Sequence, residues 1–176
     1  FVGGFVPALI FGVAMGNVLQ GVPFRLEPDM QIFYDGSFFG LLNPFALLCG
    51  LVSVAMLVMH GASWLVLKTE GAVAWRARNW GMRAAVAVVV LYALAGWALW
   101  SFVDGFRITS EIVTTGASNP LFKTVQGEGG AWFANYAAHP WTLAAPVLGF
   151  LGALLALLGL ARRWEGVTML FSSLSI

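Results

Sequence analysis

The sequence predicts an all-α fold, a polytopic bundle of transmembrane helices. Hydrophobic residues make up 60% of the chain and charged residues only 10%, whereas a soluble globular domain carries roughly 25% charged residues. Four stretches each supply the ~20 mainly apolar residues that a spanning helix needs. These stretches lack the polar-apolar alternation of barrel strands, so helices are expected.

The expected spans follow one another with polar connections between them. Both ends of the chain lie within apolar stretches and there is no initiator Met, which indicates an internal fragment of a longer membrane protein. We expect a single transmembrane domain with four spans and a fifth, truncated one, at residues 1–21, 41–67, 84–103, 141–161 and 166–176.

The first span carries small residues and two amides. Ala8, Gly12 and Gly16 are spaced four apart, so they share one helix face and predict a groove for close packing of a neighbouring helix. Asn17 and Gln20 lie near the end of this span. Two roles suit these amides: hydrogen bonds to adjacent helices and the following loop, or binding of a quinone carbonyl or a water. The first role is the simpler one.

The second span begins with an Asn-Pro pair. Asn43 before Pro44 is typical of a helix start, with the Asn side chain as the cap and Pro at the first helical position. Capping is therefore the expected role of Asn43, with a polar contact to a bound molecule as the alternative. Cys49, within the same span, is the only cysteine of the chain and has no disulfide partner here.

His60 lies late in the second span and must be weighed as a heme ligand, since histidine commonly binds heme iron. The other histidine, His139, precedes the fourth span. By alternation of the spans the two histidines lie at opposite faces of the membrane and cannot hold one iron. We therefore expect no heme ligand in this chain, and His60 is expected to form a hydrogen bond or to exchange protons.

The third and fourth spans offer little chemistry. Trp97 and Trp100 near one end of the third span, and Trp80 near the other, are typical interfacial anchors. Asp104 follows this span, either as a solvated helix end or as part of a water path. No catalytic or metal-binding motif occurs anywhere in the chain, and a net charge of only +1 does not indicate a nucleic-acid partner.

Charge sorts the connections onto two sides of the membrane. Segments 22–40 and 104–140 together carry three basic and six acidic residues, whereas segments 68–83 and 162–165 carry six basic and two acidic residues. Basic residues concentrate in short cytoplasmic loops. We therefore expect the first pair in the periplasm and the second pair in the cytoplasm. Turn signals and aromatic residues in segment 104–140 indicate an ordered cap packed on the bundle.

Several stretches resemble one family in order and spacing. They are GFVPALIFGVAMGNVLQGVPF at 4–24, FFGLLNPFALLCGLVSVAMLVMHGASWLVLKTEG at 38–71, ASNPLFKTV at 117–125 and GAWFANY at 130–136. Together they resemble subunit II of the bacterial cytochrome bd ubiquinol oxidases over essentially the whole chain.

This resemblance implies a heme-free subunit of a respiratory quinol:dioxygen oxidoreductase in the bacterial inner membrane. Its partner, subunit I, would hold heme b and heme d and carry the quinol-oxidising loop. Subunit II would support assembly and heme stability during electrogenic reduction of oxygen to water. The resemblance also implies contacts with membrane lipid and small accessory single-span subunits, and in some members a structural quinone.

The family's acidic proton-path residues lie in helices that precede this chain, and the family does not require histidine at position 60. No catalytic residue is therefore carried over. A membrane carrier or channel subunit with a polar site between kinked helices is the alternative class. Such a protein would be expected to show matched Gly- or Pro-interrupted helices. Pro7 and Pro146 interrupt the first and fourth spans, but their surroundings do not match.

Overall fold

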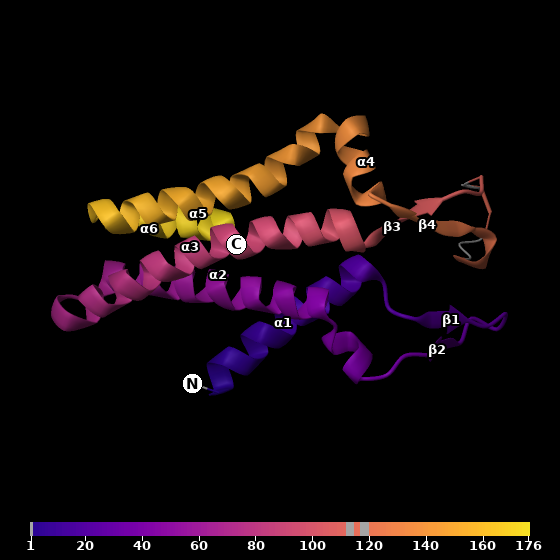
Figure 1. Ribbon diagram of the computed structural model, residues 1–176, viewed down its shortest axis with the longest axis horizontal. Coiled ribbons are helices and arrows are strands. Elements are labelled where there is room, and N and C mark those ends of the chain that lie inside the picture. The colour runs from indigo at the N-terminus through magenta and orange to yellow at the C-terminus, as the bar shows by residue number, and fades with distance from the viewer. Residues whose placement is uncertain (1, 112–114, 117–119) are drawn as a thin grey trace.

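The computed structural model of the protein describes residues 2–111, 115–116 and 120–176. Phe1, the first residue of the expected first span, and residues 118–119 of the expected Ser-Asn-Pro turn lie outside the described residues. Successive long helices run in opposite directions along the bundle and pack side by side (Figure 1). Their bounds are α1 Val2–Gln20, α2 Pro44–Lys68, α3 Gly71–Phe102, α5 Ala144–Arg162 and α6 Glu165–Ser175.

Four helical segments of the described chain are long and apolar enough to cross a membrane: α1, α2, α3 and the segment from Pro140 to Arg162. The predicted class, an all-α polytopic bundle, is therefore confirmed. The helix at the fifth expected span, α6, has 11 residues. At 1.5 Å per residue it covers only about half of a hydrocarbon core of roughly 30 Å.

The largest departure from the expected elements is at the start of α3. Residues 71–83 were expected in a cytoplasmic connection, but they are the first turns of a 32-residue helix. Hydropathy does not detect these turns because Arg76, Arg78 and Arg83 lower it, although arginine and alanine are good helix formers. The connection between α2 and α3 is reduced to Thr69 and Glu70.

Two other helix starts differ by a few residues. The second expected span began at residue 41, whereas a short 3-10 turn, η1 (Phe39–Leu42), precedes α2 and the α-helix begins at Pro44. Another 3-10 turn, η3 (Pro140–Leu143), precedes α5. Asn43-Pro44 lies between η1 and α2, whereas His139-Pro140 lies before η3. A helical segment begins at each proline because a residue that precedes proline disfavours helical backbone angles.

Strands, which were not foreseen, occur at one end of the bundle. They form two antiparallel hairpins that extend past the helix ends (Figure 1). The pairs are β1 (Phe24–Leu26) with β2 (Ile32–Tyr34), and β3 (Asp104–Ile108) with β4 (Val125–Gly129). Segment 104–140 is thus only partly the expected cap. Its hairpin projects, while a short helix, α4 (Ala131–Ala138), packs against β3 and η3, and η2 (Pro120–Phe122) precedes β4.

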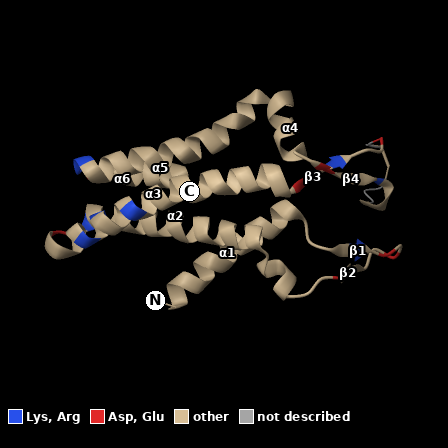
Figure 2. Ribbon diagram, in the orientation of Figure 1, with Lys and Arg blue, Asp and Glu red and all other residues tan. Residues whose placement is uncertain are grey.

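The two ends of the bundle differ in charge. Basic residues gather where α2 meets α3 and where α5 meets α6, while most acidic residues lie in the hairpin segments (Figure 2). We call these the basic end and the hairpin end. Between them, the core is made of small and aliphatic side chains such as Met59, Ala85, Val88 and Ala156, which bring α2, α3 and α5 together.

Candidate functional site

The hairpin end of α1 and the start of α2 bring three of the sequence-predicted polar residues together. Asn17, Gln20 and Asn43 line one cavity of about 320 Å³ between α1, the β1–β2 hairpin and η1. Asn17 is 8% exposed. The other lining residues are Gly21, Pro23, Tyr34, Gly36, Ser37, Gly40 and Leu41. Among the described residues this is the place where predicted site residues meet, so we treat it as the candidate site.

Asn43 caps α2, as the Asn-Pro pair indicated. Its Oδ1 accepts a hydrogen bond from the Ala46 backbone N–H at 2.8 Å. Its Nδ2 donates to Asn17 Oδ1 at 3.3 Å and to the Gly40 carbonyl at 3.4 Å. The cap therefore also ties the start of α2 to the end of α1.

Asn17 completes this connection. Its Nδ2 donates to the Val13 carbonyl at 2.8 Å and to the Leu41 carbonyl at 2.7 Å. An amide NH₂ group has two protons, and both are used within the protein. The same holds for Asn43, so neither residue has a spare donor for a quinone carbonyl.

Gln20 differs from its two neighbours. Its Oε1 is buried and has no hydrogen-bond partner. Most buried polar atoms in proteins are hydrogen-bonded, and an exception calls for a physical explanation. Gln20 is therefore the amide of this cavity whose oxygen is not used within the protein.

His60 lies elsewhere, on the face of α2 that meets α6. Its Nδ1 is 3.1 Å from the Ser172 hydroxyl oxygen, and that hydroxyl is also 3.0 Å from the Met169 carbonyl, to which it donates. Because a hydroxyl has a single proton, the Nδ1–H tautomer satisfies both contacts. Ser172 is fully buried. His60 thus holds α6 against α2, and the hydroxyl that it contacts was not foreseen from the sequence.

Asp104 does not join either group. It is exposed at the first position of β3, where it pairs with Gly129 of β4. Its carboxylate is a solvated surface group at the hairpin end. Among the described residues, no three His, Cys, Asp or Glu side chains are grouped so that they could hold a metal ion.

Arg78 makes a contact that sequence reasoning missed. Its Nη1 donates to the Leu160 carbonyl at 2.7 Å and its Nη2 is 3.5 Å from the Glu165 carboxylate. The Arg78 side chain, 16% exposed, therefore holds the turn between α5 and α6 at the basic end. No signal for this contact was available, because residue 78 was expected in a loop.

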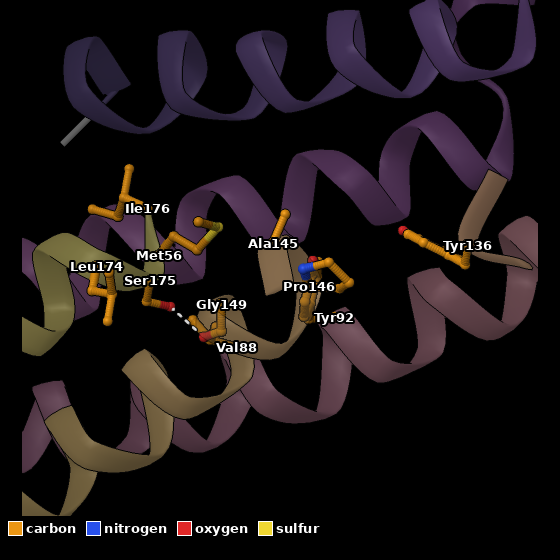
Figure 3. Close-up of a pocket in the computed structure, with 10 residues that line it drawn as sticks. All are labelled: Met56, Val88, Tyr92, Tyr136, Ala145, Pro146, Gly149, Leu174, Ser175 and Ile176. Carbon is orange, nitrogen blue, oxygen red and sulfur yellow. Dashed lines mark hydrogen bonds between the residues drawn. The ribbon is translucent and has the colours of Figure 1, made fainter. Parts of the chain in front are cut away.

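A second cavity, of about 400 Å³, lies among α2, α3, α4, α5 and α6 (Figure 3). Its walls are mainly apolar and include Met56, Val88 and Pro146, with the phenol groups of Tyr92 and Tyr136 toward the hairpin end. None of its ten lining residues is charged. Five helices contribute to its walls, and none of the lining residues has a buried polar side-chain atom without a partner.

The profile of the family described as cytochrome bd terminal oxidase subunit II matches residues 1–176. The chain belongs to this family. It is 48% identical to a protein of Haemophilus influenzae named probable cytochrome oxidase subunit 2, and 42% identical to cytochrome bd-I ubiquinol oxidase subunit 2 of Escherichia coli K12.

Both alignments include the whole chain but only 46% of each relative. The chain therefore spans about half the length of the curated subunit II proteins it matches. Membership of the subunit II family and the four apolar helices support a multi-pass protein of the bacterial inner membrane. The family resemblance that was drawn from the quoted stretches is confirmed.

Proposed function

We propose that this chain is part of a heme-free subunit of a respiratory quinol:dioxygen oxidoreductase of the cytochrome bd type. In this proposal it supports the assembly and stability of a heme-bearing subunit I, while heme b and heme d remain in that partner. The match of the whole chain to the subunit II family carries the proposal. Its E. coli relative is named as a subunit of a ubiquinol oxidase.

The two histidines of the chain are not placed to share one heme. His60 uses its Nδ1 on Ser172 between α2 and α6, and His139 follows α4 at the hairpin end. The two histidines lie at different ends of the bundle, so they cannot both be axial ligands of one heme iron. This arrangement supports a structural role for the subunit.

Spectra of the purified complex would test the proposal. The complex would be isolated through a tag on this subunit, and b- and d-type bands are expected in its reduced-minus-oxidised spectrum. His60→Gln and His139→Gln should leave the positions and relative intensities of these bands unchanged. A preparation without the bands would overturn the oxidase assignment, whereas loss of one b-type band in either variant would overturn only the heme-free role.

The charge distribution supports a sidedness for the bundle. We propose that the basic end faces the cytoplasm and the hairpin end the periplasm, because basic residues are retained on the cytoplasmic side. In a Cys49→Ser background, Ser37→Cys should react with a membrane-impermeant thiol reagent in spheroplasts, and Arg163→Cys only in inverted vesicles. The opposite pattern would reverse the orientation.

The carrier alternative receives less support. Pro7 and Pro146 lie inside continuous helices, α1 and α5, whereas carriers place substrates between discontinuous half-helices. A structural quinone is kept as a proposed component of the complex, but Asn17 and Asn43 have no free N–H groups for its carbonyls. Small accessory subunits are likewise a proposal, drawn from the family alone.

A further inference from the structure

The first turns of α3 carry two arginines on one exposed face. Arg76 and Arg83 are seven residues apart, which is two helical turns, so they lie on the same side of α3 with Trp80 between them. All three residues are exposed. Arg78 lies about 200° around the helix from Arg76, and its side chain contacts α5 and α6. Arg76 and Arg83 therefore face away from α5 and α6.

Neither of these two arginines is neutralised within the described part of the protein. The ion pairs of the described residues involve Arg25, Arg78 and Arg107, and neither Arg76 nor Arg83 is among them. The Arg83 guanidinium carbon lies 5.2 Å from the centre of the Trp80 ring. A cation–π contact of this kind orients the guanidinium without compensating its charge. This face therefore presents two positive charges that lack an anionic partner among the described residues.

The position of this face along α3 places it at the lipid headgroups. A helix of 32 residues is about 48 Å long, whereas a hydrocarbon core is roughly 30 Å thick, so α3 extends beyond the core. The uncharged stretch of α3 begins after Arg83, which places Arg83 at the boundary of the core. Arg76 lies about 10 Å farther out. Trp80 lies between them in the headgroup layer, where tryptophan is enriched.

Large apolar side chains continue this face across the membrane. Val90 and Trp97 repeat the seven-residue spacing of the two arginines, Leu94 lies between them, and all three are exposed. Helices that approach each other in a membrane use small residues, as α1 does at Gly12. Large exposed residues therefore favour lipid over another helix as the neighbour of this face. Its order, basic and then apolar, matches a phospholipid with its phosphate at the arginines and its acyl chains along α3.

We propose that this face of α3 binds the anionic phospholipid phosphatidylglycerol, with Arg76 and Arg83 as hydrogen-bond donors to its phosphate. The planar guanidinium group matches the geometry of phosphate oxygens. A zwitterionic phospholipid offers the same phosphate but adds an ammonium group. Segments 68–83 and 162–165 at this end carry six basic and two acidic residues, so a further positive charge is repelled. This inference does not depend on the proposed oxidase function.

Lipid titration of the purified complex would test the proposal. The full-length subunit in its native complex would be delipidated in detergent and titrated with phosphatidylglycerol or with phosphatidylethanolamine of the same acyl chains. Bound lipid would be counted by native mass spectrometry, and phosphatidylglycerol is expected to bind more tightly. The double variant Arg76→Gln/Arg83→Gln should weaken its binding about 30-fold, because each basic residue near a lipid surface contributes a factor of about five. Equal affinities of the unmodified complex for the two lipids would overturn the recognition of a net negative headgroup.

A second double variant provides the matched control. Arg162→Gln/Arg163→Gln removes the same charge from the basic end, but at the end of α5, which lies on the other side of α3. It should bind phosphatidylglycerol like the unmodified complex. An equal loss in both double variants would show that the total charge of the basic end attracts the lipid. Unchanged binding in Arg76→Gln/Arg83→Gln would overturn the site, and loss of subunit I from that variant would show that protein covers this face.

Discussion

Two helix contacts in this protein bring backbones close together by different means. Between α1 and α2, glycines lie on both helices: a Cβ on Gly12 would be 2.6 Å from Gly50 Cα, and one on Gly50 would be 2.9 Å from the Leu9 carbonyl oxygen. Between α5 and α6, the glycines lie on α5 alone. A Cβ on Gly152 would be 2.8 Å from the Phe171 carbonyl oxygen.

A serine hydroxyl crosses each of these contacts. Ser53 donates to the Ala8 carbonyl at 2.8 Å, and Ser175 donates to the Gly149 carbonyl at 3.0 Å. On the α6 side of the second contact, the buried Thr168 also lies against Gly159 of α5. Small residues let helices approach in a membrane, where lipid is as apolar as leucine. The comparison shows that this approach can rest on glycines of both helices or on glycine against hydroxyl residues.

The largest effect is expected where glycines face each other. The Gly12→Val side chain would clash with the backbone of Cys49 and Gly50. A backbone cannot relieve a clash by a change of rotamer, as a side chain can. We expect a loss of about 3 kcal/mol in the free energy of unfolding, the upper end for an overpacked site. Titration of the purified subunit with a denaturing detergent would measure it.

Gly4→Val is the matched control, because a Cβ on Gly4 meets nothing within 4 Å. It lies on the same helix and adds the same side chain, so its effect should stay within about 0.5 kcal/mol. Equal losses for Gly4→Val and Gly12→Val would show that the close approach of α1 to α2 at Gly12 is not the cause of the loss.

A smaller effect is expected at the contact with glycine on one helix. Gly152→Ala adds a single methyl group against α6, and α6 is short enough to shift slightly. We expect a loss of about 1–2 kcal/mol, measured by the same titration. Gly166→Ala, at an open position of α6, is the control. A loss at Gly152 larger than that of Gly12→Val would reverse the ranking of the two contacts.

The smallest effects are expected at the two serines. Ser53→Ala and Ser175→Ala each remove one hydrogen bond between helices, which is worth about 0.6 kcal/mol on average in membrane proteins. Ser173→Ala removes a hydroxyl that bonds only within α6, to the Met169 carbonyl, and should be close to neutral. If all three variants behave alike, the hydroxyls that cross between helices do not stabilise either contact.

Sequence reasoning succeeded where a local pattern determines the structure. The count of apolar spans, the Asn43-Pro44 helix start and the four-residue spacing through Gly12 all depend on neighbours along one helix. The first turns of α3 were missed because their arginines resemble those of a loop, and the hairpins because short strands have little periodicity. Arg78 could not be connected to Leu160 or Glu165 without knowing how α3 packs on α5 and α6.

The sequence by itself determined that the protein lies in a membrane. It also determined the number of spans, their alternating direction and the family. These follow from apolar content and from motifs that are read along the chain. Only the tertiary structure decided that Asn17 and Asn43 use all their amide protons on the protein while Gln20 Oε1 is buried without a partner. It also decided that His60 contacts Ser172. Such pairings depend on which faces of different helices meet, and no single segment carries that information.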